Sequence, residues 1–115
     1  MTHTTKYIGG VLRAALCALA LANANLAAYA RDPKELFDKS CAPCHSKDGT
    51  AQTPAAKKLG VKDLSQSKLT DEQIADQIRK GKQDKQGVSK MPAYKDKLTP
   101  DEIKSLVPVV KGFRK

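Results

Sequence analysis

Apolar residues recur three and four positions apart along much of the chain, which is the spacing of helices that bury one face. No stretch alternates apolar and polar residues in the way that a half-buried strand does. Capping residues precede the apolar runs and glycine follows two of them, so the helix ends can also be placed. The predicted helices cover residues 32–41, 54–60, 70–81 and 99–113.

The last predicted helix carries the longest apolar stripe and also a proline. Five apolar residues share its inner face: Ile103, Leu106, Val107, Val110 and Phe113. At 100° per residue, Pro108 points roughly opposite this stripe. A proline inside a helix removes one backbone hydrogen bond, and the solvent side of a helix that curves around a core can best spare that bond. We therefore predict a bend at Pro108 and no break.

Residues 1–30 follow a different pattern. Lys6 and Arg13 flank a polar start, an apolar run covers residues 14–22, and small residues stand at Ala28 and Ala30. This order is that of a secretory signal peptide, and nine apolar residues are too few to cross a bilayer, which needs roughly 20. We predict cleavage after Ala30, a mature domain of residues 31–115 in the periplasm, and no stable membrane insertion.

Removal of the signal segment changes the inventory of residues. Cys17, His3 and Met1 leave with it, and the mature segment has 85 residues (115 minus 30). It keeps 19 Lys and Arg (21 minus 2) and 12 Asp and Glu, a net charge of +7. Its only aromatic residues are Phe37, Tyr94 and Phe113. Because small domains with a thin core often depend on a bound group, the composition favours a cofactor that supplies apolar area.

The run CAPCH at residues 41–45 holds both remaining cysteines and the only remaining histidine. A structural zinc site needs four Cys or His ligands, and the mature segment offers three. A thiol–disulfide redox pair expects a βαβ context, which is missing. The spacing C-x-x-C-H specifically signals covalent haem attachment. The thiols of Cys41 and Cys44 can add across the two vinyl groups of a porphyrin, and His45 then lies under the ring facing the iron. We predict one haem c per chain.

A second axial ligand can be sought among the residues that remain. The candidates are Met91, the lysines and, more weakly, Tyr94. Met91 is the only thioether in the mature segment, it lies on a predicted polar loop, and Pro92 stiffens the backbone directly after it. A lone methionine on a helical stripe is usually core packing, but Met91 is not on such a stripe. We expect Met91 to be the ligand, and iron with one His and one Met is typical of electron transfer.

With these motifs in place, the mature segment resembles a small soluble bacterial class I c-type cytochrome with one haem. The resemblance implies an all-α cytochrome c fold, with about four short helices wrapped around one covalently bound haem. It implies that Cys41 and Cys44 form the thioethers and that His45 and Met91 are the axial iron ligands. It also implies that the carbonyl group of Pro54 accepts a hydrogen bond from the second ring nitrogen of His45, which would fix the tautomer.

The resemblance extends to the two terminal helices, with some departures. Phe37 matches the aromatic residue of the family's first helix, and LTPDEIKSLV resembles the final helix that packs across it. Pro33 stands where family members often carry glycine. Val109 stands where an aromatic residue is usual, and Pro108 replaces an ordinary residue. We therefore expect a looser crossing of the two terminal helices than is usual in the family.

These features favour a periplasmic one-electron carrier, not an enzyme, that shuttles electrons between respiratory or other redox partners. Lysines gather around Met91 at positions 80, 82, 85, 90, 95 and 97. A basic ring beside the haem edge would attract acidic docking patches on partner proteins, although lysines are also the usual residues of a solvated surface. Export argues against nucleic acid as a partner, and we expect a monomer. The alternative is a haem enzyme or gas-binding protein, which needs a displaceable distal ligand.

Overall fold

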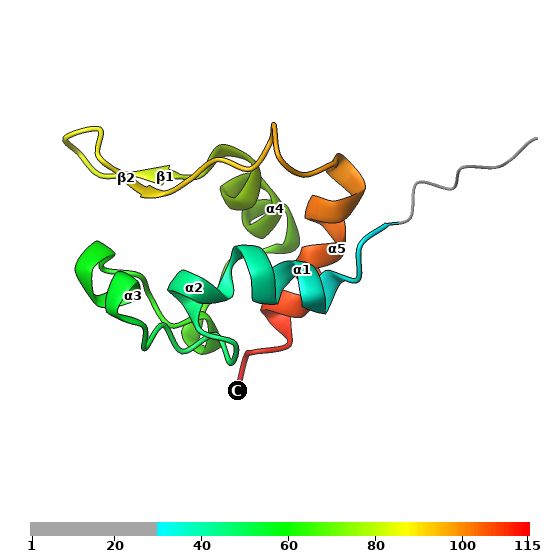
Figure 1. The fold of residues 1–115 in the computed structure, drawn as a ribbon, viewed down its shortest axis with the longest axis horizontal. Helices are drawn as coiled ribbons and strands as arrows, with labels where there is room; N and C mark the ends of the chain where they lie inside the picture. Colours follow the sequence, from blue (N-terminus) through cyan, green and yellow to red (C-terminus); the bar gives the residue numbers. More distant parts are fainter. Residues whose placement is uncertain (1–29) are drawn as a thin grey trace, which may run out of the picture.

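The structure, a computed structural model, describes residues 30–115; the predicted signal segment lies outside the described residues except for Ala30. This part of the chain is mostly helical, and one short hairpin lies between the last two helices (Figure 1). In chain order the elements are α1 (Pro33–Ser40), α2 (Ala42–His45), α3 (Pro54–Leu59), the 3₁₀ helix η1 (Leu64–Gln66), α4 (Asp71–Lys80), β1 (Lys82–Gln83), β2 (Ser89–Met91) and α5 (Pro100–Lys111). None of the described helices has the length and apolar character needed to cross a membrane.

The helix starts predicted from capping residues are confirmed. The side chain of Asp32 accepts a hydrogen bond from the backbone N–H of Glu35 at the start of α1. Thr53 caps α3 in the same way. Thr70 and Thr99 open α4 and α5 with complete capping boxes, in which the residue three positions on bonds back to the backbone of the threonine. Each cap satisfies N–H groups that have no partner within the helix.

Residues 82–91 form a two-stranded antiparallel hairpin, so the loop predicted there is wrong. Lys82 pairs with Met91, and the register shifts beside this pair. The side chain of Asp84 closes the turn, since its Oδ1 accepts from the backbone N–H groups of Gln86 (3.0 Å) and Val88 (2.9 Å). The hairpin is therefore stabilised by the hydrogen bonds of its turn. Its strands lack the alternating apolar pattern from which a strand would be predicted.

The core lies where α1, α4 and α5 meet (Figure 1). The most deeply buried large side chains are Phe37, Leu36 and Leu106. Phe37 of α1 packs against Phe113 just after α5, with ring centroids 5.0 Å apart. Thus the two terminal helices meet through an aromatic pair. Pro108 is exposed and α5 continues past it to Lys111, so the helix is not broken there, as predicted.

The residue that comes directly after the predicted cleavage point is tied to α5. The guanidinium group of Arg31 donates to both carboxylate oxygens of Glu102, with Nε–Oε1 and Nη2–Oε2 distances of 2.6 and 3.0 Å. Glu102 is buried, and its carboxylate also accepts from the backbone N–H of Thr99. These bonds to the ionised form, the one from Arg31 first, lower the pKa of Glu102 to about 2. Arg31 is thereby fixed to the last helix.

Candidate functional site

Residues 41–45 form a compact helical turn directly after α1. Cys41 ends α1, with its N–H bonded to the carbonyl oxygen of Phe37 (2.8 Å). The N–H groups of Cys44 and His45 then donate to the carbonyl oxygen of Cys41, at 3.1 and 2.8 Å. The helical turn brings both cysteines and the histidine to one wall of a cavity. Both thiols are free and half-buried, so they are available for covalent attachment of a group in that cavity.

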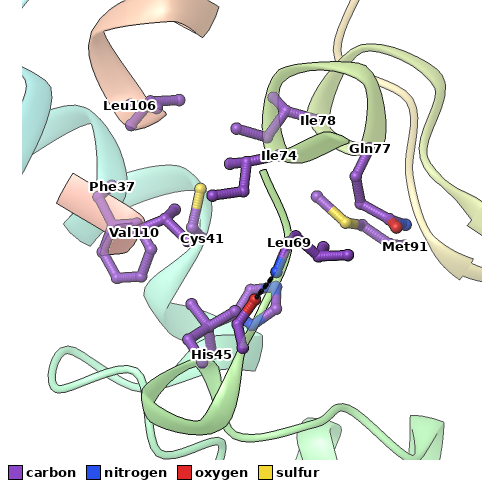
Figure 2. A pocket seen from close by; sticks show the side chains of 12 residues that line it. Phe37, Cys41, His45, Leu69, Ile74, Gln77, Ile78, Met91, Leu106 and Val110 are labelled. Atoms are coloured by element: carbon purple, nitrogen blue, oxygen red, sulfur yellow. Dashed lines mark hydrogen bonds between the residues drawn. The ribbon is translucent and has the colours of Figure 1, made fainter. Parts of the chain in front are cut away.

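Two cavities with shared lining residues open beside this turn. The larger has a volume of about 870 Å³ and is lined by Cys41, Cys44, His45 and Met91 among others. This volume lies within the range of about 300–1,000 Å³ that is usual for ligand and cofactor sites. A smaller cavity of about 70 Å³ shares Cys41, His45 and Met91 with it and is lined by core residues such as Phe37 and Leu106 (Figure 2). The wall of this smaller cavity is therefore apolar, as a site for a porphyrin ring requires.

His45 is the clearest sign that the cavity is built for a partner group. Its side chain lines both cavities, and its Nδ1 is buried with no hydrogen-bond partner. A buried polar atom without a partner costs free energy, so one in a native fold needs an explanation. Burial also lowers the pKa of His45, which favours the neutral imidazole that binds metals. The residues present thus fit a haem whose iron takes one imidazole nitrogen and fixes the orientation of the ring.

No hydrogen bond between Pro54 and His45 is found among residues 30–115, and the role expected for the Pro54 carbonyl group stays a prediction. Pro54 is the first residue of α3, and Nδ1 of His45 has no hydrogen-bond partner. Instead Thr53, the residue before the proline, connects the two segments. Its hydroxyl donates to the carbonyl oxygen of Cys44 (3.2 Å) and accepts from the N–H of Ala56. The contact between α3 and residues 41–45 therefore runs through a threonine whose position predicts only a helix start.

Met91 lines the same cavity but comes from a segment that is distant in the sequence. It is the last residue of β2, and it is half-buried beside the apolar core. Figure 2 shows its thioether on the cavity wall that Gln77 and Ile78 of α4 also form. The fold thus places Cys41, Cys44, His45 and Met91 around one cavity, although Met91 comes 46 positions after His45 in the sequence. Met91 lies on a strand and not on the predicted loop.

Tyr94, which the sequence offered only as a weak ligand candidate, has a structural contact across the cavity. Its hydroxyl donates to the carbonyl oxygen of Ser40 (2.9 Å), 54 positions away. The side chain is half-buried and lines the larger cavity. Burial, with the nearby cysteines, raises the pKa of Tyr94, so the hydroxyl remains a donor. No local sequence pattern predicts this bond, because its two residues are far apart in the chain.

Burial also shapes the chemistry of Cys41. Loss of water contact, and next the neighbouring Cys44, raise the pKa of the Cys41 thiol to about 11. The protonated thiol is the form that resists oxidation and metal binding. Among residues 30–115 there is also no group of three or more His, Cys, Asp and Glu placed to hold a metal ion. The zinc and redox-thiol alternatives therefore gain no support from the geometry.

The mouth of the larger cavity carries mixed charge with an excess of lysine. The charged residues that line it are Lys62, Asp63, Lys68, Lys82, Asp84 and Lys90. Lys90 is paired with Asp84 at an Nζ–Oδ2 distance of 3.4 Å. Further out, Lys80 is paired with Asp76 (2.8 Å). Of the lysines predicted to surround the site, Lys82 and Lys90 line the cavity together with Met91, and Asp84 neutralises part of the charge of Lys90.

Comparison with known families and structures gives an independent assignment. The family model described as "Cytochrome C oxidase, cbb3-type, subunit III" matches residues 28–108. A comparison with curated proteins finds no match. Among solved structures, the c-type cytochrome KustC0563 is 38% identical with a TM-score of 0.63, over 73% of this chain and 99% of that one. A mutant of the same cytochrome gives 38% identity and a TM-score of 0.61, over 72% and 99%.

A larger assembly contains a similar domain. The structure described as a reducing HAO-like protein complex, Kustc0457/Kustc0458, from Kuenenia stuttgartiensis is 28% identical with a TM-score of 0.60. The match covers 71% of this chain and 41% of that chain. Family, fold and the CAPCH turn agree with one another, and a domain of this kind transfers electrons through a covalently bound haem. The chain therefore belongs to the cytochrome c family matched here and is a small monohaem c-type cytochrome.

Proposed function

We propose that this protein is a periplasmic one-electron carrier, not an enzyme, with a single haem c attached to Cys41 and Cys44 and ligated by His45 and Met91. The observation that carries the proposal is the convergence of these four side chains on one cavity. Both thiols are free, and the imidazole has a buried nitrogen without a partner. Among the described residues that line the cavity, His45 alone offers a neutral imidazole nitrogen.

The chemistry that the haem supplies when bound is a reversible change of one electron at the iron. The residues of the chain hold and shield it. Cys41 and Cys44 tether the ring to α1 and α2, and the apolar side chains of the smaller cavity exclude water. His45 stays neutral because it is buried. Met91 would hold the haem iron through its thioether sulfur, which would favour the reduced form and raise the potential.

We propose further that partners approach the lysine-rich mouth of the cavity. Lys62, Lys68 and Lys82 line it and take part in none of the ion pairs found among residues 30–115. An acidic surface on a donor or acceptor would be steered toward this mouth, and salt would weaken the steering. A second-order reduction rate that falls as ionic strength rises would agree with this orientation.

The decisive experiment compares the wild-type protein with Met91→Ala. The wild-type protein should give a reduced-minus-oxidised spectrum of haem c, and its ferric form should show the near-red band of sulfur-to-iron charge transfer. Met91→Ala should lose that band, keep the covalent haem, show a lower potential in a redox titration and bind carbon monoxide readily. Lys85→Ala, a change at an exposed residue of the same hairpin that lines neither cavity, is the matched control and should leave the band in place.

Two results would overturn the ligand assignment. A ferric wild-type protein without the near-red band would show that Met91 is not bound to iron. A wild-type ferrous protein that binds carbon monoxide rapidly and fully at neutral pH would favour the alternative, a haem enzyme or gas-binding protein with a displaceable ligand. Either result leaves the family assignment intact, because that assignment rests on the CAPCH turn and the fold.

A further inference from the structure

The residues that come after Met91 are fastened to the end of α4 by backbone hydrogen bonds. The N–H of Tyr94 donates to the carbonyl oxygen of Ile78 (3.0 Å), and the N–H of Lys95 donates to that of Arg79 (3.2 Å). These carbonyl groups belong to the last turn of α4, where helical partners run out. The Met91 segment, defined as residues 91–94, therefore completes the end of α4, and its position depends on that helix.

Gly81 allows this close approach. It stands between α4 and β1 with φ +70° and ψ −164°, a conformation that is essentially restricted to glycine. A Cβ atom at this position would lie 2.4 Å from the carbonyl oxygen of Met91 and 2.7 Å from the backbone nitrogen of Ala93. Those neighbours are backbone atoms and cannot swing aside. By contrast, Gly60 also has a positive φ (+68°), but a Cβ atom there would meet nothing within 4 Å.

Tyr94 ties the other end of the Met91 segment across the cavity. Its hydroxyl bonds to the carbonyl oxygen of Ser40, the last residue of α1 and the neighbour of Cys41. The ammonium group of Lys97 lies 5.8 Å from the centre of the tyrosine ring, a cation–π distance. Hence one side chain connects the strand that carries Met91 to the turn that carries Cys41, Cys44 and His45.

We infer that Gly81 and Tyr94 are positioning residues that hold Met91 at the cavity: Gly81 by admitting the backbone of residues 91–93, and Tyr94 by bonding to Ser40 beside the attachment turn. This inference rests on the proposed function, because it concerns the residue proposed as the distal ligand. The two residues act on opposite ends of the segment, so each limits how often Met91 can leave the cavity. Neither needs to touch the iron.

Binding of an external ligand to the ferric protein measures how often Met91 leaves. Imidazole can bind only to the population in which Met91 has left, so its apparent affinity reports that population. Tyr94→Phe removes one hydroxyl and one hydrogen bond and should tighten imidazole binding about fivefold. Gly81→Ala adds a methyl group against backbone and should tighten it about tenfold or more. Both variants should also lower the reduction potential and the intensity of the near-red band at high temperature.

The matched control for general loss of stability is Ile103→Val. Ile103 is buried in α5, lines neither cavity and makes no bond to the Met91 segment. Its variant should reduce the unfolding temperature about as much as Tyr94→Phe does, while its affinity for imidazole stays that of the wild type. Because Tyr94→Phe is a mild change, it keeps the test valid even if Gly81→Ala does not fold.

The outcomes separate the inference from the function on which it rests. If the wild-type protein lacks the near-red band, the Met91 assignment itself fails. If the wild type has the band and both variants bind imidazole with wild-type affinity, the positioning role is wrong. It is also wrong if Ile103→Val tightens imidazole binding as much as Tyr94→Phe does, since the effect would then be one of global stability.

Discussion

The two sides of the cavity are built in different ways. Residues 41–45 continue directly from α1, whose Leu36 and Phe37 are almost completely buried. The Met91 segment sits on a short hairpin and a turn, and its own residues are half-buried or exposed. The first side is held by core packing and local helix bonds. The second is held by bonds to the end of α4, by the close approach at Gly81 and by the hydroxyl of Tyr94.

This difference separates two kinds of stability. Apolar burial is shared by α1, α4 and α5, so disruption of it unfolds the domain as a whole. Segments with few buried apolar contacts can open at a lower free energy than global unfolding. We therefore expect the CAPCH side to remain intact under conditions in which Met91 exchanges with other ligands. In the proposed carrier, covalent attachment at Cys41 and Cys44 would retain the haem even when Met91 leaves the cavity.

The strongest test of the comparison removes the covalent tether. Cys41→Ser combined with Cys44→Ser should yield a chain that carries no haem after denaturation, because no thiol remains to form a thioether. Mass spectrometry of the denatured protein measures the attached haem directly. The control is Met91→Ala, which should keep the full mass of the haem adduct. Haem that stays on the doubly substituted chain through denaturation would contradict the assignment of the tether.

A cavity in the core should weaken the whole domain. Phe37 is 1% exposed and contacts Phe113, so Phe37→Ala should lower the free energy of unfolding by about 3–5 kcal/mol. Urea unfolding of the ferric holoprotein, followed by far-ultraviolet circular dichroism, provides the measurement. Val88→Ala is the control, because Val88 is 52% exposed on the hairpin and should change stability by less than about 0.5 kcal/mol. Equal effects of the two changes would refute this account of the core.

A smaller effect should depend on pH through Glu102. Its folded-state pKa is about 2, below the ordinary value of 4.5, because Arg31 and the N–H of Thr99 bond to the ionised carboxylate. A lowered folded-state pKa means that Glu102 stabilises the fold above about pH 4.5 and loses this effect as the pH falls toward about 2. Glu102→Gln keeps an oxygen for the cap but loses the charge. It should therefore melt a few degrees lower than the wild type at neutral pH and equally at the acid end.

Thermal melts across this pH range, with the near-red band recorded in the same samples, would show whether the Arg31–Glu102 pair stabilises the whole fold or the Met91 side of the cavity. The band of Glu102→Gln should match that of the wild type at room temperature, since Glu102 lies in α5 and lines neither cavity. Glu35→Gln serves as the control. Glu35 forms an exposed ion pair with Lys39 (2.6 Å), a kind of pair that contributes little. A gap between Glu102→Gln and wild type that persists down to pH 2 would contradict the assigned pKa.

The helices could be predicted because their capping residues lie close to their partners in the sequence. Contacts between residues that are far apart in the sequence have no such local signal. The caps at Asp32, Thr53, Thr70 and Thr99 lie within three residues of their partners, so the sequence shows them directly. The sequence also names four candidate haem ligands, from the CAPCH spacing and from the single methionine outside the predicted signal segment, and all four side chains line one cavity. Their placement together comes from the fold, which brings β2 over to the end of α1.

The features that the sequence did not predict depend on pairs far apart in the chain. The bond from Tyr94 to Ser40 joins residues 54 positions apart, and that from Arg31 to Glu102 spans 71. The hairpin was missed for a different reason, since Asp84 builds its turn without any alternating apolar pattern. The role expected for Pro54 came from resemblance alone and stays a prediction, while Thr53 makes a different contact, from its hydroxyl to the carbonyl oxygen of Cys44.

The span of the Tyr94–Ser40 bond has a consequence for the order of assembly. The hydrogen bonds that residues 41–45 themselves make reach at most nine positions along the chain, so this turn can form as soon as the chain extends past α3. The tyrosine bond must instead close a loop of 54 residues, and loop closure over such a length costs entropy that local bonds do not. The attachment turn can therefore be complete before the Met91 segment reaches its place at the cavity.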